Sequence, residues 1–333
     1  MKKLINAVDT VLAESLDGFA AAHADIVVLG EERKFVRRRT PTPGKVALIS
    51  GGGSGHEPLH AGFVGSGMLD AACPGHVFTS PTPDQMVAAT EAVDTGAGCL
   101  FVVKNYEGDV MNFDMAAEMA REMAGREILT VRTDDDVAVE DSTWTTGRRG
   151  VAGTLVVERI VGAAAERMDA LSELKALGDE VNGRTRSMGV ALTPCTVPAA
   201  GSPTFTLAED EMEMGVGIHG EPGRRRVKLA KADDIAAELL GAILGDLSPK
   251  RGDPVLLLVN GFGGTPSMEL YLMVNAARRI LTEAGVEVTR FLTGSYVTSL
   301  EMAGCSITCT VLDDRLTGLW DAPVHTAALR WGM

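Results

Sequence analysis

Short runs of apolar residues alternate along the chain with segments whose apolar residues recur at helical spacing. A continuous apolar run of about four to eight residues is typical of a strand buried on both faces of a sheet. Such strands are predicted at residues 46–50, 99–103, 128–131, 188–192, 255–259 and 286–291, and helices at residues 84–93, 114–123, 233–244 and 267–284. Strands that alternate with helices in this order predict an α/β fold, with largely parallel or mixed sheets flanked by helices.

The chain has 333 residues, which is enough for about two domains. A helical stretch at residues 153–177 ends at the polar segment 182–187, and a new strand pattern follows. We therefore predict two α/β domains, an N-terminal one at residues 1–183 and a C-terminal one at residues 184–333. Acidic residues interrupt the apolar periodicity of residues 1–16, which predicts an amphipathic helix rather than a signal peptide.

The net charge of −14 argues against a nucleic-acid partner, because neutralising phosphates requires a basic face. The one basic cluster, at residues 37–39, is short and is expected to be solvated. No stretch approaches the ~20 uninterrupted apolar residues of a membrane helix, so no membrane partner is expected. The five cysteines form no CxxC pair, which is typical of a protein of the reducing cytoplasm.

The strongest local signal is the segment GGGSGHEP at residues 51–58, directly after the first predicted strand. Clustered glycines at a strand end let backbone N–H groups approach a ligand, and ligands of open α/β sheets bind at such ends. The alternative is a tight turn without a ligand. The segment lacks the Lys of a Walker loop, and His56 stands where the dinucleotide fingerprint and the nucleophile elbow need a small residue.

Residues 56–60, His-Glu-Pro-Leu-His, also satisfy H-E-x-x-H, the pattern of zinc proteases. That chemistry needs both histidines on one face of a helix, together with a third ligand. Here His56 follows a glycine run, and Pro58 fits only the first turn of a helix. We therefore expect no metal site in this segment.

Three other segments place polar side chains among glycines. Residues 104–113, KNYEGDVMNF, bring an ammonium and a carboxylate to the same rim of the sheet as the first glycines, although lone charged residues in a loop are usually only solvated. Residues 215–223, GVGIHGEPG, hold a histidine on a tightly turned backbone, whereas a core histidine normally has bulky neighbours. Residues 260–266, NGFGGTP, either shape a pocket wall or make a turn.

Two charged clusters also invite a functional interpretation. Asp134, Asp135 and Asp136 offer the carboxylates that magnesium prefers, but adjacent residues of an extended chain point in alternating directions. We therefore expect a polar loop there. Arg148 and Arg149 could meet an anionic partner or pair with nearby acids, and pairing is favoured.

Together, these segments resemble the dihydroxyacetone-binding (K) subunit family of dihydroxyacetone kinase. The similarity runs in order from about residue 45 to the C-terminus. It is carried by the motifs SGHEP, FTSPTPDQ, KNYEGDVMNF, DDDVAV, GRRGVAGT, CTVPAAG and GIHGEPG and by the ending DAPVHT. The segment at residues 224–253 is shorter than the corresponding segment of that family, and its sequence is less typical of it.

The resemblance implies that His219, in the C-terminal domain, adds to the carbonyl of dihydroxyacetone and holds it as a hemiaminal. It implies that His56 takes the proton from the hydroxyl that is phosphorylated, with help from Asp109. Contacts to the substrate are implied for Gly53, Ser54, Gly55, His56, Lys104 and Asp109. A bond to the carbonyl rejects polyols such as glycerol, which non-covalent contacts would disfavour by only about 1–3 kcal/mol.

The resemblance also implies a division of labour between two proteins. Phosphoryl transfer needs a phosphate donor and a metal ion, and in that family a separate helical subunit carries ADP or ATP with magnesium. We expect no cofactor or metal on this chain, whose length excludes a fused donor domain. The chain purified alone is then expected to bind substrate without transferring a phosphoryl group. The family further implies a homodimer.

Alternatives remain for the substrate and for the role of the chain. A four-carbon ketose such as erythrulose presents the same hydroxyketone end as dihydroxyacetone. A non-catalytic coactivator that senses a ketose is a second possibility, although the retention of His56 and Asp109 favours an enzyme. Both ATP and a phosphotransferase relay are compatible with the sequence as the source that recharges the donor subunit.

Overall fold

The computed structural model describes residues 2–139, 147–221 and 223–333, and these form two compact units. The first unit comprises Lys2–Thr133, Thr154–Glu180 and Gly318–Met333, and the second comprises Asp134–Gly153 and Val181–Thr317. This division differs from the single boundary predicted after residue 183, because each unit is assembled from separate segments of the chain.

The first unit is built on a six-stranded sheet with the strand order β1-β2-β5-β3-β6-β7. These strands are β1 (Val27–Leu29), β2 (Val36–Arg38), β3 (Ala47–Ser54), β5 (Ala71–Val77), β6 (Cys99–Lys104) and β7 (Ile128–Thr133). The pairs β3–β5, β3–β6 and β6–β7 are parallel, whereas β1–β2 and β2–β5 are antiparallel. The carboxyl ends of β3 and β6 therefore lie side by side, as expected for the rim of a parallel sheet.

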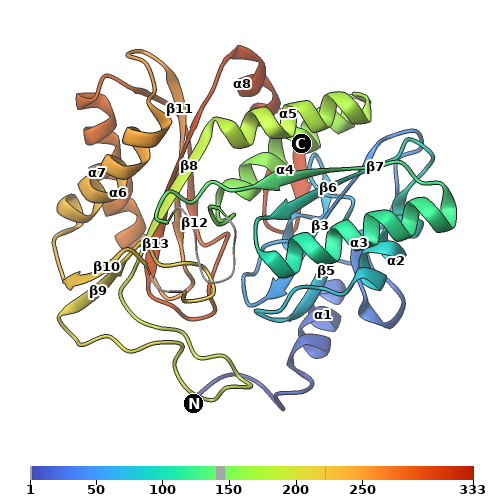
Figure 1. The fold of residues 1–333 in the computed structure, drawn as a ribbon, viewed down its shortest axis with the longest axis horizontal. Coiled ribbons are helices and arrows are strands. Elements are labelled where there is room, and N and C mark those ends of the chain that lie inside the picture. Colours follow the sequence, from blue (N-terminus) through green and yellow to red (C-terminus); the bar gives the residue numbers. More distant parts are fainter. Residues whose placement is uncertain (1, 140–146, 222) are drawn as a thin grey trace. The chain divides into compact units, whose positions relative to one another are not determined.

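Helices cover both faces of this sheet, and Figure 1 shows α3 lying along it. The helices of the first unit are α1 (Val11–Ala22), α2 (Pro83–Val93), α3 (Glu107–Ala124), α4 (Gly153–Glu166) and α5 (Leu171–Gly183). Apolar residues of α2 and α3 form one core with Ile49, Cys73 and Phe101 of the strands. On the opposite face, Gly178 of α5 packs against Val131 of β7.

Two predicted helices of this unit have different limits in the structure. The predicted helix at residues 1–16 begins only at Val11, and the predicted stretch at residues 153–177 is two helices, α4 and α5. Helix α2 begins where expected, because Pro83 occupies its first position, within a Thr82–Gln85 capping box. In this box the Thr82 amide donates to Gln85 at 3.0 Å.

The second unit has a mixed six-stranded sheet with the order β10-β9-β8-β13-β11-β12. Its strands are β8 (Thr185–Ala191), β9 (Glu211–Met214), β10 (Arg225–Lys228), β11 (Pro254–Gly261), β12 (Glu287–Gly294) and β13 (Gly304–Val311). Helices α6 (Ala232–Leu247) and α7 (Ser267–Glu283) pack on one face of it. Only β11 and β12 are parallel, so this sheet is mixed.

Shorter elements complete the chain. They are the 3-10 helices η1 (Glu31–Arg33) and η2 (Ala61–Phe63), the helix α8 (Asp314–Asp321), and a small sheet of β4 (Gly65–Ser66), β14 (Val324–Thr326) and β15 (Arg330–Trp331). The two large sheets with their flanking helices confirm the predicted α/β class.

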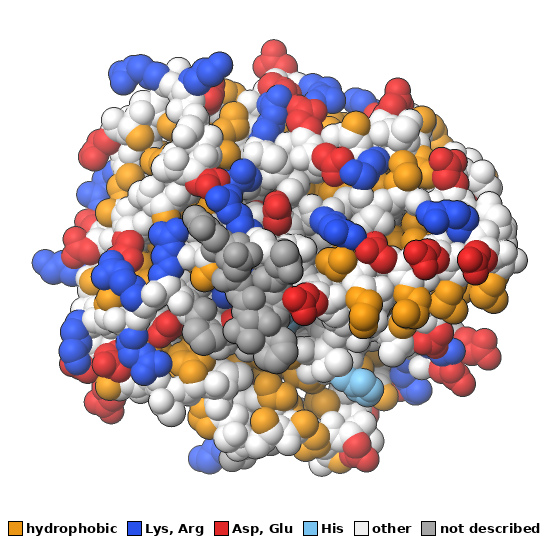
Figure 2. All heavy atoms as spheres, in the orientation of Figure 1, with side chains coloured by type: hydrophobic (Ala, Val, Ile, Leu, Met, Phe, Trp, Pro, Cys, Tyr) orange, Lys and Arg blue, Asp and Glu red, His pale blue; other side chains and the backbone are white. Residues whose placement is uncertain are grey.

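Charged side chains of both signs lie on the surface of the protein. On the face drawn in Figure 2, acidic and basic side chains are interspersed. The prediction that the basic cluster is solvated is wrong for Arg38, whose side chain is only 11% exposed and pairs with Asp70 and Glu166.

All five cysteines are reduced and buried. None of the described helices is long and apolar enough to cross a membrane.

Candidate functional site

The glycine run lies inside strand β3 rather than after it, because the strand continues through Ser54. Atoms of other segments lie so close to these glycines that a side chain there would collide with them. A Cβ on Gly52 would stand 2.3 Å from Nζ of Lys104, and a Cβ on Gly53 would stand 2.6 Å from the backbone nitrogen of Thr79. The run therefore lets a lysine and a neighbouring loop approach the backbone of β3 closely.

Beyond β3, side chains and backbone groups hold the turn together. The hydroxyl of Ser54 donates to the carbonyl of Gly75 at 2.7 Å. Gly55 has a φ of +100°, and its N–H donates to the carboxylate of Glu57 at 2.9 Å. The turn that carries His56 is thus fixed by the bond from Ser54 to Gly75 before it and by the bond from Gly55 to Glu57 within it.

The two histidines of the H-E-x-x-H pattern have partners other than a common metal ion. His56 is buried, and its ring stacks on Phe78 with 4.9 Å between the ring centroids. Nε2 of His60 lies 3.0 Å from Nζ of Lys104, and its Nδ1 lies 2.6 Å from Oε1 of Glu158. Residues 57–60 form a turn, not an α-helix, so the helical zinc motif is not formed here.

Lys104, at the end of β6, and Asp109, in the first turn of α3, form a buried ion pair. Their side chains are 1% and 5% exposed, and Nζ lies 3.4 Å from Oδ2 of Asp109. The same ammonium lies 3.3 Å from the carbonyl oxygen of Gly51. The solvated alternative for these two charged residues is therefore wrong, because the parallel neighbours β3 and β6 bring them to one rim.

A cavity of about 360 Å³ lies beside this rim within the first unit. Apolar side chains of α1, among them Leu12, Leu16 and Phe19, line one side of it. The backbone of Gly52 and Gly53 lines the other side. The glycine-rich end of β3 thus borders a space large enough for a small ligand.

In the second unit, His219 is oriented by a carboxylate two residues further along the chain. Nδ1 of His219 lies 2.8 Å from Oε1 of Glu221, and the backbone N–H of His219 donates to Oε2 at 3.0 Å. A Cβ on Gly217 would stand 2.0 Å from Oε2 of Glu221 and 2.7 Å from a guanidinium nitrogen of Arg149. The glycines beside His219 therefore make room for its orienting partner.

The charge of Glu221 is stabilised by its neighbours. Burial acts to raise its pKa, but the charges of His219 and Arg149 and the hydrogen bond from His219 outweigh burial and lower the pKa to about 2. Because Nδ1 faces this permanent carboxylate, the ring proton of a neutral His219 is placed on Nδ1. The lone pair of Nε2 is then available to a carbonyl carbon.

The acidic cluster after β7 is not the polar loop that we predicted. Asp135 and Asp136 are buried, and only Asp134 is exposed. Asp135 accepts from the backbone N–H of Gly153 at 2.7 Å and thereby holds the start of α4. Asp136 pairs with the fully buried Arg149 at 2.7 Å. The carboxylates thus serve the packing of this unit, for which their sequence pattern carries no signal.

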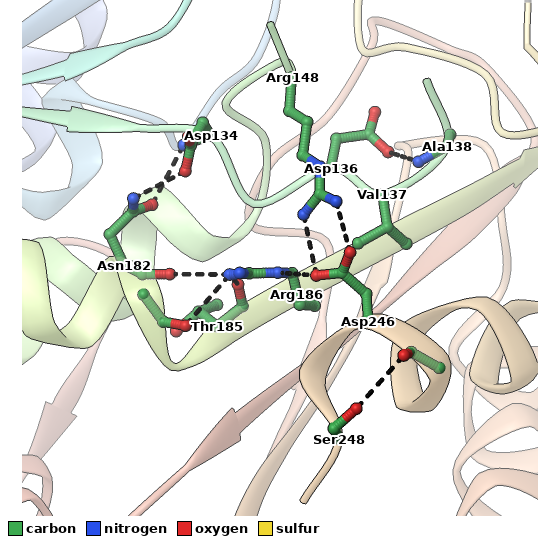
Figure 3. Close-up of polar contacts among 12 residues, drawn as sticks. Asp134, Asp136, Val137, Ala138, Arg148, Asn182, Thr185, Arg186, Asp246 and Ser248 are labelled. Carbon is green, nitrogen blue, oxygen red and sulfur yellow. Dashed lines mark hydrogen bonds and ion pairs between the residues drawn. The ribbon is translucent and has the colours of Figure 1, made fainter. Parts of the chain in front are cut away.

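The arginines after this cluster pair with acids, as predicted. Arg149 pairs with Asp136, and Figure 3 shows Arg148 and Arg186 converging on the carboxylate of Asp246 in α6. The hydrogen bond from Arg148 is the main reason that the pKa of Asp246 falls to about 2. Among the described residues, no group of three or more His, Cys, Asp and Glu side chains is placed to hold a metal ion.

The segment NGFGGTP begins within β11, which ends at Gly261, and Asn260 and Phe262 line a small cavity of the second unit. The side-chain oxygen of Asn260 accepts from the backbone nitrogens of Tyr296 and Val297 at 2.9 and 2.8 Å. Its amide nitrogen donates to the carbonyl of Val297 at 2.7 Å. This buried side chain thus fastens the end of β11 to the loop that contains Tyr296 and Val297.

Six of the predicted site residues therefore meet in the first unit, and His219 lies in the second. The six are Gly53, Ser54, Gly55, His56, Lys104 and Asp109, and all of them are buried. The sequence analysis missed the orienting partners His60, Glu158, Glu221 and Arg149. Glu221 carried a signal, because it stands in the same short motif as His219, whereas Glu158 is buried in a helix 98 residues from its partner His60.

Comparisons with known proteins identify the family to which the chain is similar. A family model described as the Dak1 domain matches residues 17–328. The chain is 51% identical over 329 residues to the PTS-dependent dihydroxyacetone kinase 1, dihydroxyacetone-binding subunit DhaK, of Listeria innocua, and the match covers 98% of this chain and 100% of that protein.

Two solved structures are also similar. The dihydroxyacetone kinase operon co-activator DhaQ has a TM-score of 0.89 and 34% identity, with coverage of 97% of this chain and 98% of that chain. The dihydroxyacetone kinase from C. freundii in complex with AMP-PNP and Mg2+ has a TM-score of 0.89 and 33% identity. That match covers 99% of this chain but only 61% of the longer kinase.

Proposed function

Because the chain belongs to the Dak1 domain family, we propose that it is the dihydroxyacetone-binding subunit of a phosphotransferase-dependent dihydroxyacetone kinase. The observation that carries this proposal is the match over the full length of a protein of that description at 51% identity. The chain holds the ketone, and a separate subunit donates the phosphoryl group.

The proposed capture step uses the orientation of His219. Nε2 attacks the carbonyl carbon, the electron pair of the C=O double bond moves to the oxygen, and the oxygen takes up a proton. This proton replaces the one that Nδ1 of the imidazole releases to water, so the resulting hemiaminal is neutral and Glu221, 2.8 Å from Nδ1, stays ionised. A substrate without a carbonyl, such as glycerol, forms no adduct.

The proposed transfer step uses the polar residues of the first unit. His56 takes the proton of the hydroxyl that attacks the phosphoryl group, and Asp109 assists it. The ammonium of Lys104, 3.4 Å from Oδ2 of Asp109, donates to a substrate oxygen. Backbone groups of Gly53, Ser54 and Gly55 hold the remaining substrate oxygens.

We place the nucleotide and magnesium on the donor subunit and none on this chain. In support, the matched part covers only 61% of the C. freundii kinase solved with AMP-PNP and Mg2+, so that kinase has further chain outside the match. We further propose a homodimer in the cytoplasm. Five reduced, buried cysteines are compatible with that compartment.

A second candidate function is a ketose-sensing coactivator. The similarity to the co-activator DhaQ, at 34% identity and a TM-score of 0.89, favours it. A sensor must capture its ligand but needs no base. The presence of both His56 and Asp109 in a buried polar site supports the kinase subunit instead.

The capture step can be tested with dihydroxyacetone labelled with ¹³C at its carbonyl. We expect the wild-type protein to move the carbonyl resonance to that of a tetrahedral carbon, and His219→Gln to abolish the change. The matched control His23→Gln, at the end of α1, should keep it. Erythrulose in a parallel sample reports the preferred chain length. A wild-type protein that forms no adduct with either ketose contradicts covalent capture.

The division of labour is tested by turnover. The chain alone with ATP and magnesium should produce no dihydroxyacetone phosphate, whereas addition of a donor subunit and phosphoenolpyruvate-driven phosphotransferase proteins should start turnover. Turnover by the chain alone contradicts the proposed division. Adduct formation without turnover in the complete mixture favours the coactivator.

A further inference from the structure

A chain of three buried polar side chains lies behind the glycines of β3, and the transfer step described above does not use two of them. The side chains of Lys104, His60 and Glu158 are 1%, 4% and 0% exposed. They come from β6, from the turn before η2 and from α4. Burying three ionisable groups together is costly unless their hydrogen bonds are satisfied, so their arrangement requires a reason.

The ammonium of Lys104 has three donors and three neighbours. Besides Oδ2 of Asp109 at 3.4 Å and the carbonyl of Gly51 at 3.3 Å, it faces Nε2 of His60 at 3.0 Å. An ammonium can only donate. Nε2 must therefore be the acceptor, and His60 carries its ring proton on Nδ1.

The surroundings of Nδ1 support the same tautomer. The hydroxyl of Ser50 lies 3.0 Å from Nδ1 and donates its own proton to the carbonyl of Val102 at 2.7 Å, so its oxygen is left to accept. Oε1 of Glu158, 2.6 Å from Nδ1, is the second acceptor. Both neighbours of Nδ1 thus select the tautomer that offers a lone pair to Lys104.

The other carboxyl oxygen of Glu158, Oε2, can hold a proton without disturbing the bond between Oε1 and Nδ1 of His60. Oε2 is buried and has no hydrogen-bond partner among the described residues. Burial raises the pKa of Glu158 to about 8, although the charge of Lys104 opposes the shift. Burial, followed by the charges of Lys104 and His56, keeps the pKa of His60 well below its ordinary value. Near neutral pH the carboxyl group is therefore largely protonated and His60 is neutral.

We propose that His60 and Glu158 are positioning residues for substrate binding: Glu158 fixes the tautomer of His60, and His60 holds the ammonium of Lys104 beside Asp109. This inference rests on the proposed function, in which Lys104 and Asp109 contact the ketose. Neither His60 nor Glu158 is among the residues for which a substrate contact is proposed above.

The charges around Glu158 give the direction of a pH effect. Lys104 from β6 and His60 and His56 from the turn after β3 face this site, and Asp109 from α3 faces Lys104. When Glu158 ionises, its negative charge draws the ammonium towards His60 and weakens it as a donor to the substrate. Affinity for dihydroxyacetone should therefore fall as the pH rises through about 8.

A purely structural role predicts something different. Buried ion pairs and polar networks can often be replaced by apolar side chains of similar size without loss of the fold. If the network only fills space, Glu158→Leu and His60→Phe bind substrate as well as the wild type does. If it positions Lys104, both variants lose the fixed acceptor for the ammonium, and binding weakens.

The test is a calorimetric titration with dihydroxyacetone between pH 6.5 and 9.5. At pH 7 we expect Glu158→Leu and His60→Phe to weaken binding at least tenfold. Glu158→Gln keeps an oxygen opposite Nδ1 and should stay within about threefold of the wild type. From pH 7 to 9.5 the wild type should lose about tenfold in affinity, and Glu158→Gln should not. The control Glu166→Gln, also on α4 but bonded to Arg38, should follow the wild type at every pH.

The outcomes separate this inference from the proposed function. Wild-type affinity in both Glu158→Leu and His60→Phe overturns the inference, and so does an alkaline loss in Glu158→Gln that equals the wild-type loss. If the leucine variant does not fold, the comparison of Glu158→Gln with the wild type still decides. A wild-type protein that binds no ketose overturns the proposed function and the inference with it, whereas binding that ignores these substitutions overturns the inference alone.

Discussion

Two buried glutamates have opposite acid–base behaviour in this protein. Burial acts to raise the pKa of both carboxyl groups. Glu221 lies beside His219 and Arg149, whose interactions with the carboxylate more than compensate, and its pKa is about 2. Glu158 has a neutral histidine as its bonded partner, and its pKa is about 8. The neighbours of each carboxyl group, rather than its residue type, therefore decide whether it serves as a permanent anion or as a group that titrates near neutral pH.

The permanent charge of Glu221 can be tested through adduct formation. In Glu221→Gln the amide can donate to Nδ1 of His219, which moves the ring proton to Nε2 and removes the nucleophilic lone pair. We expect the affinity for labelled dihydroxyacetone to fall by at least about tenfold at pH 7.5, by analogy with other histidines held in the wrong tautomer. Carbonyl ¹³C resonance intensities measure the bound fraction. The exposed Glu209→Gln serves as control, and an unchanged adduct in Glu221→Gln would show that the carboxylate does not set the tautomer.

At the scale of elements, the strands and helices followed from periodicity, but the site contacts did not. The apolar runs at residues 99–103 and 255–259 became β6 and β11 almost unchanged, because burial on both faces leaves a local pattern. The continuation of β3 through Gly51–Gly53 was missed, because its cause is the approach of Lys104 and Thr79 from other segments. His60 and Glu158 were missed for the same reason: their pairing is a tertiary contact that no local pattern encodes.

The close approach at Gly52 predicts a specific loss of function. A Cβ there would stand 2.3 Å from Nζ of Lys104, so Gly52→Ala must displace the buried ammonium from Asp109. We expect ketose affinity to fall at least tenfold, together with about 1–3 kcal/mol of stability lost to overpacking. Calorimetric titration and urea unfolding measure the two effects.

The matched control for Gly52 is a glycine in a helix. Gly241 lies within α6, and a Cβ there would meet nothing within 4 Å. Gly241→Ala should leave ketose affinity unchanged and raise the unfolding free energy by about 0.5–1 kcal/mol, because alanine loses less backbone entropy in a helix. Unchanged affinity in Gly52→Ala as well would show that Lys104 can move without consequence.

At the scale of the whole molecule, stability responds to the sum of all titrating groups, and the chain carries a net charge of −14. Self-repulsion among acidic residues grows as the pH rises, but salt screens charges on the surface. The buried Glu158 is not screened in this way. Its ionisation should therefore lower stability between pH 6 and 8 even at moderate ionic strength.

The sign of this effect follows from proton binding. The carboxyl group of Glu158 has a pKa of about 8 in the folded protein and an ordinary value of 4.5. Between these values the folded state holds one proton more than the unfolded state, so the stabilising contribution is complete below pH 4.5 and is lost as the pH rises through about 8. The loss amounts to about 1.4 kcal/mol per pH unit in that window. Urea unfolding of the wild type at pH 6, 7, 8 and 9 in 150 mM salt should show this slope up to about pH 8 and little further loss at pH 9. Glu158→Gln should lack it and Glu166→Gln should keep it. Parallel curves for the wild type and Glu158→Gln would mean that Glu158 is already ionised at pH 6, in which case it holds His60 as a permanent anion rather than as a neutral acid.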